Sequence, residues 1–431
     1  MQRRRVARSL FAFVSIIAAT PAALPGQGLR QEIEHDLFTF GSCGQPLCLG
    51  GSLAGHGEHF IPAAEQNGGV LIGLIASSIA ISVSNTPIAS SSSGTTFRFE
   101  GGVPVKTSTS AGPIFAERAQ TLGRGRFFAS LNVTTTTFER LRGIPLSNLQ
   151  FNFTHENEPP LDTMGMPVFE NDLVQVQVAF KASTIVSTGS LTWGIVDGLD
   201  LGVVVPFVHV SESGTSLAQI LPISGTNVHF FGTPQNPVLT ATSSTEGTAS
   251  GLGDVGARLK INIAQTSHVG VGVFADARFP TGNADNLLGS GAFMGRGLGI
   301  VSATWGNFNP HVNFGYTLRD AKDQNNSVSM VAGFDELVSS FATMALDVLG
   351  EWRVGESALQ IPPPVVYQYP YTRSVNVTNI PSSEDNYLSL AFGFKFQTRA
   401  GMRIVANGLF PLRNSGMQPS ATWTGGLEYN F

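Results

Sequence analysis

Apolar and polar side chains alternate along many segments of this chain of 431 residues. Successive side chains of a β-strand point to opposite faces, so an alternating segment forms a strand with one apolar and one polar face. Between residues 256 and 263 every odd-numbered residue is apolar, whereas the intervening positions include Arg258 and Lys260. The pattern recurs in residues 174–181, 269–279, 311–319, 344–352, 388–397 and 402–410. It predicts an all-β fold of paired antiparallel strands.

Alternation alone also fits a soluble sandwich, so composition has to separate the two possibilities. Charged residues make up only 13% of the chain, against about 25% in typical soluble domains. Beyond the N-terminus the best apolar stretch is Val70–Val83, which contains serines. It is shorter than the ~20 residues that a membrane-spanning helix needs. A transmembrane barrel fits better, because only every second residue of its strands has to face lipid.

The N-terminus has the pattern of a secretory signal peptide. Arg3, Arg4 and Arg5 precede the apolar stretch Leu10–Thr20, and small residues follow at positions 22 and 23. The apolar stretch is too short for a membrane anchor. We therefore expect export and cleavage, with residues 1–26 as the signal peptide.

Aromatic and apolar residues share one face of the last expected strand. Trp423, Leu427, Tyr429 and Phe431 occupy alternate positions, and the chain ends on the last of them. The segment resembles the C-terminal strand of outer-membrane proteins, which the barrel assembly machinery recognises. Aromatic residues near strand ends are also typical of the girdles at the two membrane surfaces. We expect an outer-membrane protein whose partners include lipid and that machinery.

Short and long connections alternate between the expected strands. Tight turns are expected near residues 266–267, 307–308 and 399–400, and long connections near 212–251 and 354–384. Outer-membrane barrels have short periplasmic turns and longer outer loops. The spacing predicts a transmembrane up-and-down antiparallel β-barrel of about twelve strands.

The barrel is expected to occupy residues 121–431, which leaves residues 27–120 as an N-terminal segment. This segment contains the Ser-rich stretch 90–94 and could form a plug, a cap or an extra hairpin. In the last case Val70–Val83 and Phe97–Glu100 would raise the number of strands to about fourteen.

Charged residues on the polar faces of the strands are candidates for the lining of the barrel. They are Lys181, Arg258, Lys260, Asp276, Arg278, Arg319, Asp347, Glu351, Lys395 and Arg403. Two interpretations stay open: a lattice of ion pairs in a closed interior, or a pore lining that sets selectivity. Asp335 and Glu336 are interpreted as part of a turn.

Two motifs point to structural roles. Cys43 and Cys48 are expected to form a local disulfide in an oxidising compartment. Gly251–Gly256 matches the G-x-G-x-x-G spacing. Dinucleotide binding would require a helix after it, whereas an alternating strand follows.

No pattern indicates catalysis or a bound cofactor. His56, Glu58 and His59 lie close in sequence but lack a third nearby ligand, so we expect no metal. A G-x-S-x-G hydrolase motif is absent from the sequence. The formal net charge of −5 argues against nucleic acid as a partner. We expect neither a cofactor nor enzymatic activity.

Three segments together resemble a known group of outer-membrane barrels, the MetA-pathway-of-phenol-degradation proteins. The matching residues are Ile195, Asp197, Leu199-Asp200-Leu201-Gly202 and Pro206, the start Gly251-Leu-Gly253-Asp254, and Arg278, Pro280-Thr281-Gly282 and Leu287-Leu288-Gly289. The resemblance covers roughly residues 120–431 and departs at Ser290, where Thr is usual. It implies a barrel for uptake of small hydrophobic or aromatic compounds, and it transfers no binding residues.

The sequence thus predicts an outer-membrane channel for passive passage of small solutes, hydrophobic or aromatic ones by resemblance. The long connections would be its gates. The alternative is a non-conducting structural or surface-interaction barrel whose lumen is plugged by the N-terminal segment. A membrane-embedded hydrolase is the least favoured interpretation, since no Ser/His set is recognisable.

Overall fold

The last strand of the chain pairs with the first strand of the barrel. In the computed structural model, β23 (Thr422–Asn430) hydrogen-bonds antiparallel with β3 (Phe127–Phe138), and Leu427 lies opposite Leu131. The structure describes residues 28–41, 44–49, 60, 67–84, 86, 90–91, 97–100, 103–106, 110–154, 172–221, 229–320, 324–367 and 372–431.

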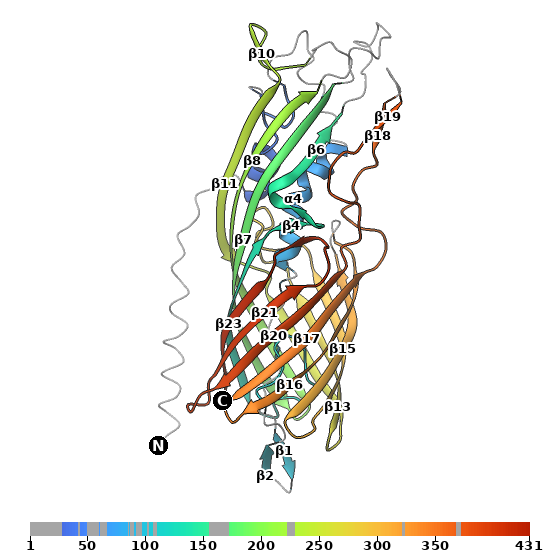
Figure 1. Cartoon of the computed structure of the whole chain (residues 1–431). Helices are drawn as coiled ribbons and strands as arrows, with labels where there is room; N and C mark the ends of the chain where they lie inside the picture. Colours follow the sequence, from blue (N-terminus) through green and yellow to red (C-terminus); the bar gives the residue numbers. More distant parts are fainter. Residues whose placement is uncertain are drawn as a thin grey trace.

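Within these residues, twelve strands form a closed antiparallel barrel, which confirms the expected fold (Figure 1). Between β3 and β23 its strands are β7 (Leu173–Val196), β8 (Leu199–Leu221), β12 (Gly256–Gln265), β13 (Val269–Arg278), β14 (Met294–Ala303), β15 (Phe308–Arg319), β16 (Ser327–Ser339), β17 (Ala342–Arg353), β20 (Tyr387–Gln397) and β21 (Arg403–Pro411).

Short turns gather at the end of the barrel where the C-terminus lies, here called the C-terminal rim (Figure 1). The turns there are residues 197–198, 266–268, 304–307, 340–341 and 398–402. The connections at the other end are longer, and the one after β17 carries the small hairpin β18 (Val365–Tyr367) and β19 (Arg373–Val375). This alternation follows the expected order.

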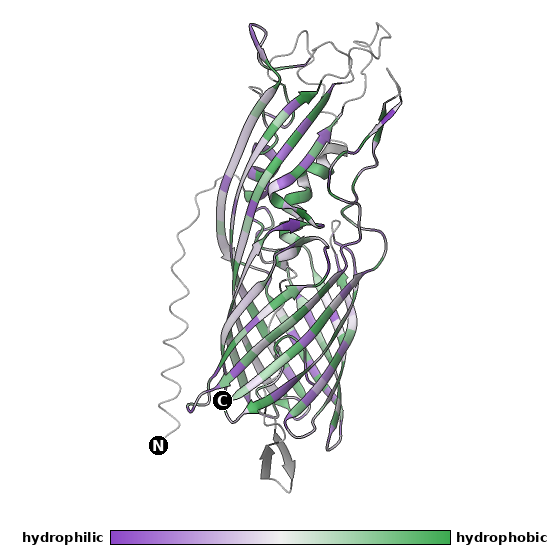
Figure 2. Ribbon diagram, viewed as in Figure 1, coloured by the Kyte–Doolittle hydropathy of each residue, from purple (hydrophilic) through white to green (hydrophobic). Residues whose placement is uncertain are grey.

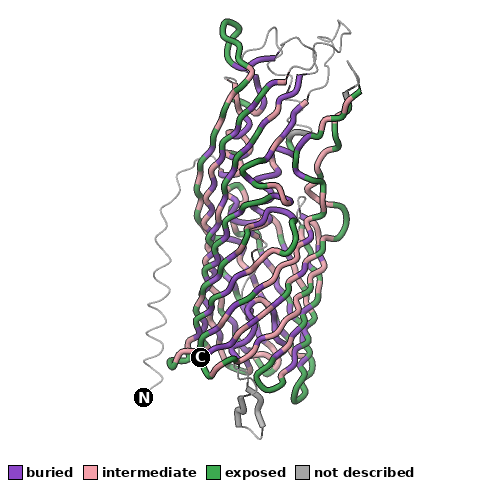
Figure 3. The backbone as a smooth tube through the Cα atoms, viewed as in Figure 1, coloured by how far each residue is buried: buried purple, intermediate pink, exposed green. Residues whose placement is uncertain are grey.

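Large apolar side chains are exposed on the outward face of the barrel. Among them are Leu191, Val203, Val301 and Phe314, which are 40–60% exposed, in the order 48%, 47%, 50% and 59%. Buried and exposed positions alternate along many of the strands, most regularly along β3, β7, β8 and β13 (Figure 3). An apolar surface around a whole barrel exceeds what soluble proteins expose and matches the hydrocarbon layer of a bilayer. The barrel therefore spans a membrane.

Two strands continue far beyond the barrel. β7 and β8 run from Leu173 to Leu221, about twice the 9–11 residues per strand that cross a bilayer. Near the C-terminal rim they pair with β3 and β12, whereas their distant halves pair with β6 (Leu149–Phe153) and β11 (Thr240–Leu252). The resulting four-stranded sheet, here called the extension, stands above one side of the barrel (Figure 1).

The apolar face of β7 changes sides between the barrel and the extension. In the extension the inward positions are apolar, as in Val176 and Phe180, and in the barrel they are polar, as in Thr188. The outward positions change in the opposite sense, from Lys181 to Leu191. Hydrophobic and hydrophilic residues alternate along the strands of both parts (Figure 2).

The expectation that Lys181 lines the lumen is therefore wrong. Its side chain is exposed on the outer face of the extension, and Phe180 is the buried neighbour. The sequence analysis assumed that apolar positions always face lipid. In the extension they face a core inside the protein, so the polar positions face water.

The long connection expected at residues 212–251 is also wrong. β8 continues to Leu221, and β11 pairs with it along its whole length. These segments are rich in Ser and Thr and have no strong apolar alternation. Their outer face meets water, and this removes the signal that identifies the strands inside the membrane.

An apolar core fills the inner side of the extension. Its helical part comprises α2 (Leu29–Gln31), η2 (Glu32–Asp36) and α4 (Asn67–Ser84), which pack against β6, β7 and β8. α4 is apolar around most of its circumference, as expected for a helix buried on all sides. Among the described helices, none is long and apolar enough to cross a membrane.

The fourteen-strand alternative is wrong, because residues 70–83 belong to the helix α4. The apolar residues of this segment do not alternate with polar ones at a period of two. In the core, the helix is covered on all sides. Residues 97–100 do form a strand, β1 (Phe97–Glu100), which pairs with β2 (Val103–Lys106). This hairpin lies beyond the C-terminal rim and is no part of the barrel wall (Figure 1).

Further short elements complete the fold. They are β4 (Arg140–Leu141), β5 (Ile144–Pro145), η4 (Leu146–Asn148), β9 (Phe231–Thr233), β10 (Asn236–Val238) and β22 (Met417–Gln418). β22 pairs with β4 and so joins the last loop of the barrel to the base of the extension.

Two carboxyl groups meet where the N-terminal helical segment packs on the extension. Glu212 of β8 is only 2% exposed, and its Oε1 accepts a hydrogen bond from Thr245 Oγ1 at 3.1 Å. The Oε2 atoms of Glu212 and Glu32 have no hydrogen-bond partner among the described residues. Gly247 lies between them, because a Cβ at this position would overlap the carboxylate of Glu32.

The contrast between barrel and extension predicts the outcome of two matched substitutions. Val203→Arg places a charge on the lipid-facing side of β8 and should lower the free energy of unfolding in bilayers by about 2–4 kcal/mol. Gln177→Arg, on the exposed face of the extension, should leave it unchanged. Urea unfolding in lipid vesicles measures both. Equal losses for the two variants would contradict the assignment of the membrane boundary.

Glu212 predicts a pH-dependent packing of the helical segment. It lies beyond the apolar band, and burial raises its pKa to about 7, with smaller contributions from Glu32, Asp36 and Glu246 and an opposing one from the Thr245 hydrogen bond. A carboxyl with a raised pKa stabilises the packed state while protonated, so packing weakens by at most roughly 3 kcal/mol as the pH rises from the ordinary pKa of 4.5 through 7.

We expect amide hydrogens of residues 29–36, corrected for intrinsic rates, to exchange faster at pH 8 than at pH 6. Glu212→Gln should remove most of this difference, whereas Glu246→Gln, an exposed neighbour, should retain it. Protection that is independent of pH in the unmodified protein would refute the role of Glu212.

Candidate functional site

Residues 110–122, here called the plug, lie inside the lumen near the C-terminal rim. The wall fixes their backbone through side chains from four strands. The four contacts are Ala111 N to Thr343 Oγ1 at 2.8 Å, Glu117 N to Asn313 Oδ1 at 2.6 Å, Ala119 N to Ser302 Oγ at 3.1 Å, and Leu122 N to an Asp200 carboxylate oxygen at 3.0 Å. The acceptors lie on β17, β15, β14 and β8, which are spread around the barrel. The plug is therefore held across the lumen rather than against one side.

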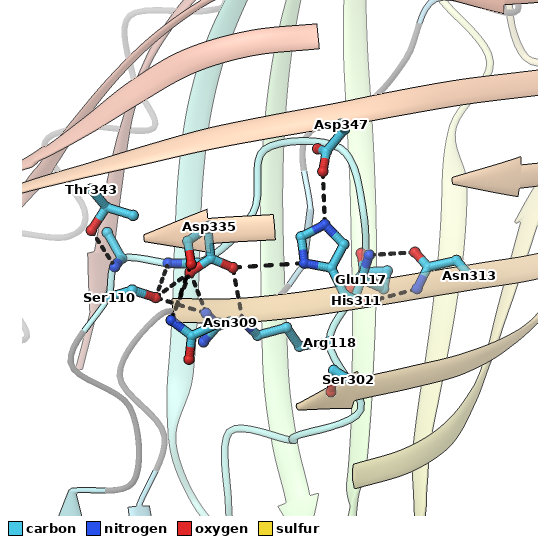
Figure 4. Close-up of polar contacts among 12 residues, drawn as sticks. Ser110, Glu117, Arg118, Ser302, Asn309, His311, Asn313, Asp335, Thr343 and Asp347 are labelled. Atoms are coloured by element: carbon cyan, nitrogen blue, oxygen red, sulfur yellow. Dashed lines mark hydrogen bonds and ion pairs between the residues drawn. The ribbon is translucent and has the colours of Figure 1, made fainter. Parts of the chain in front are cut away.

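A buried carboxylate on the wall forms the main anchor of the plug. Asp335 of β16 is fully buried and forms an ion pair with Arg118, whose Nε lies 3.2 Å from Asp335 Oδ1 (Figure 4). Ser110 Oγ also donates to this carboxylate, and Asn309 Nδ2 approaches it at 3.3 Å. His311 links it to the next acid, since its Nε2 lies 2.7 Å from Asp347 Oδ1.

A second charged contact joins the plug to another strand of the wall, β12. Glu117 Oε2 lies 3.3 Å from Lys260 Nζ, and both side chains are buried. Ser91 donates to the same carboxylate from its backbone amide at 2.7 Å and its hydroxyl at 2.8 Å. Lys260 thus points into the lumen as expected, but its partner comes from the N-terminal segment.

These anchors could not be recognised from the sequence for two reasons. Glu117 and Arg118 precede the first alternating strand, so no periodicity marked them. The interpretation of Asp335 as part of a turn is wrong, because it lies within β16 and faces inward. The parity of Ser327, Ser329 and Asp335 along that strand was the signal that could have placed it.

Arginines dominate the half of the lumen that lies farther from the C-terminal rim. Asp276 of β13 is surrounded by Arg258, Arg278 and Arg296 at 3.7, 3.6 and 2.9 Å. Arg258 and Arg296 stand directly opposite Asp276 on the two neighbouring strands. The sequence analysis missed Arg296, because its strand is rich in glycine and alternates weakly.

A similar group lies on the next strands around the barrel. Glu351 of β17 contacts Arg319 at 2.7 Å and Arg353 at 3.1 Å. Elsewhere on the inner face, Lys395 pairs with Glu428 at 2.7 Å, and Arg403 Nε donates to Gln397 Oε1 at 3.1 Å. All the predicted interior charges except Lys181 therefore lie on the inner face. Most of them contact a charged partner, which is what a lattice of ion pairs requires.

A cavity of about 200 Å³ remains in the lumen beside α4, here called the outer cavity. Ser82 and Thr86 line it from the N-terminal segment. Arg278, Arg296 and Arg319 line one side. Val331 and Leu349 line the cavity from the neighbouring strands β16 and β17. The side opposite the arginines contributes Phe138, Leu409 and Pro411, together with Thr136 and Thr422.

Hydrogen bonds connect the glycine-rich motif to the loop between β13 and β14. Asp254 accepts hydrogen bonds from Gly282 N at 3.1 Å and from the amide and hydroxyl of Ser290 at 2.8 and 2.9 Å. Thr281 Oγ1 donates to Gly253 O at 2.7 Å. The segment 251–256 forms the break between β11 and β12, where the strand passes from extension to barrel. Serine in place of threonine at 290 keeps the hydroxyl that this contact uses.

The C-terminal residues lie on the outward face. Trp423, Leu427, Tyr429 and Phe431 are all exposed, and Phe431 stacks on Phe127 with ring centroids 5.5 Å apart. Their recognition by an assembly machinery stays a prediction. Cys48 is disulfide-bonded, while Cys43, His56, Glu58, His59 and the expected signal peptide lie outside the described residues.

Comparisons with known proteins give distant structural similarities only. No family model and no curated protein matches the chain. A COG4313 outer-membrane channel from Pseudomonas putida F1 is 12% identical, with a TM-score of 0.42 over 73% of this chain and 98% of that one. A Pseudomonas aeruginosa FadL homologue is 13% identical (TM-score 0.31, 71% and 89% covered). The Ralstonia pickettii toluene transporter TbuX is 13% identical (TM-score 0.26, 72% and 89% covered).

The Arg118–Asp335 contact predicts how the plug can be loosened. Asp335→Asn leaves Arg118 buried without its ion-pair partner, and breaking such a pair costs about 3–5 kcal/mol. If only ~1.4 kcal/mol of this cost destabilises the packed plug, the equilibrium constant for its local opening rises tenfold. We expect amide hydrogens of residues 110–122 to exchange at least about tenfold faster in this variant.

Glu336→Gln is the matched control for that measurement. It removes a carboxylate from the adjacent position of the same strand, but on the outward face. It should leave exchange in the plug unchanged. Identical exchange in the Asp335→Asn variant and the unmodified protein would show that the ion pair does not hold the plug.

Proposed function

We propose that this protein is an outer-membrane channel for passive passage of small solutes, with residues 110–122 as an internal plug. The observation that carries this proposal is the outer cavity inside a closed barrel, lined by both charged and apolar side chains. A barrel whose only task is structural would gain from filling this space, because empty volume costs stability. The cavity instead gives a solute a place within the lumen.

The plug determines how solutes would pass. It contacts the wall through hydrogen bonds and two ion pairs, and Ala119 packs in a small apolar cluster with Phe274 and Ile300. The polar contacts can exchange with water when the plug is displaced, which lowers the cost of that displacement. Export by the cleaved signal peptide and folding by the barrel assembly machinery belong to the same proposal.

Small aromatic or hydrophobic compounds are the proposed solutes. The segments 189–210, 251–260 and 278–291 resemble barrels of the phenol-degradation group, which favours this class. The apolar side of the outer cavity supports the same class for this chain.

A second candidate function follows from the plug itself. Contacts with four strands could keep the lumen shut, so that the protein would serve as a structural or surface-interaction barrel. The extension would then be its main exposed surface. Measurements of conductance separate the two candidates.

The test compares the full chain with a variant in which Ser110, Glu117 and Arg118 are replaced by Ala, Gln and Gln. In planar bilayers and liposome-swelling assays we expect small, interrupted conductance from the unmodified protein. The variant should show larger and longer openings and faster solute entry. A heat-modifiable gel shift verifies that each barrel is folded. A folded variant without conductance or solute entry would overturn the channel and favour the second candidate.

A further inference from the structure

The outer cavity has a chemical asymmetry that points to a specific class of ligand. Around the barrel, the strands β13, β14 and β15 lie opposite β21, β23 and β3. The first group contributes Arg278, Arg296 and Arg319 to the cavity. The second contributes Phe138, Leu409 and Pro411, together with Thr136 and Thr422. A molecule in the cavity therefore meets guanidinium groups at one end and uncharged, largely apolar side chains at the other.

The cationic side carries more positive charge than its own carboxylates neutralise. Three arginines surround Asp276, and two surround Glu351. The third carboxylate that acts on this group, Asp254, is already occupied by amides and a hydroxyl of the β13–β14 loop. Glu117 of the plug acts on Arg258 as well, but it also pairs with Lys260. Six cationic side chains thus face four carboxylates in a lumen of low dielectric constant, where an additional anion gains most from their field.

Arg296 is the arginine best placed to take such an anion. Its Nη2 donates to Asp276 at 2.9 Å, whereas its buried Nε has no hydrogen-bond partner within the described part of the chain. Its side chain is 29% exposed, more than those of Arg258, Arg278 and Arg319. A guanidinium with one edge on a carboxylate can offer its remaining donors to a second one.

The size of the cavity limits the ligand. An apolar cavity of about 150 Å³ holds one benzene molecule, and the outer cavity measures about 200 Å³. One substituted aromatic ring, or an aliphatic chain of similar volume, fits this space. We propose that the outer cavity binds a small amphipathic organic anion, such as an aromatic carboxylate. Its carboxylate lies against Arg296 and its ring lies against Phe138 and Leu409.

This inference rests on the proposed function and defines its solutes more narrowly. The test uses 4-fluorobenzoate and its neutral isostere 4-fluorobenzamide, titrated by ¹⁹F NMR against the full chain in a non-ionic detergent. We expect fluorobenzoate to bind about tenfold more tightly than fluorobenzamide. Arg296→Gln should abolish that preference by weakening fluorobenzoate alone. Lys181→Gln, which removes an exposed cation from the outer face of the extension, should leave both affinities unchanged.

A second variant separates the charged side from the apolar side. Phe138→Ala should weaken both ligands by a similar factor and preserve the preference for the anion. Equal affinity of the two ligands for the unmodified protein, or an equal loss of both in a folded Arg296→Gln variant, would overturn the inference. Anion binding that depends on Arg296 without solute flux in liposomes would refute the channel and leave the binding site intact. Flux without any preference for the anion would refute the binding site and leave the channel intact.

Discussion

A strand cannot turn its side chains over without breaking its hydrogen-bonded ladder, and this constraint governs the whole molecule. β7 and β8 cross from lipid into water while each side chain keeps its direction. What changes is the environment on either side of the sheet. The membrane requires apolar residues outside and permits polar ones inside, whereas the extension needs water outside and a core inside. The exchange of apolar and polar positions near residues 182–185 of β7 marks that transition.

The barrel and the extension cover the inner face of their sheets in different ways. The extension is an open sheet, so it covers its apolar inner face with α2, η2 and α4. The barrel is closed, and its inner face is occupied by charges that pair with one another and with the plug. Both coverings come from the N-terminal segment, which therefore serves as a second, internal layer along the whole length of the protein.

The barrel could be predicted from the sequence because alternation repeats in nearly every strand within the membrane. Lys260, Arg278 and Glu351 were placed inward by parity alone, and the structure agrees. Lys181 was misplaced because parity assigns a residue to a face but does not identify the medium on that face. β11 was missed because Ser and Thr on a strand in water leave no periodic signal. Glu117 and Arg118 were missed because their conformation depends on wall residues more than 140 positions away in sequence.

The route of the N-terminal segment has a consequence for the order of assembly. The chain runs from the helical core through the lumen, forms the hairpin β1–β2 beyond the C-terminal rim, and returns as the plug before the first wall strand begins. A hairpin that has already formed at one mouth, joined to a helix lodged at the other, cannot be drawn through a cylinder afterwards. The pairing of β3 with β23 must then be the final step of folding, so that the barrel closes around an N-terminal segment that is already in position.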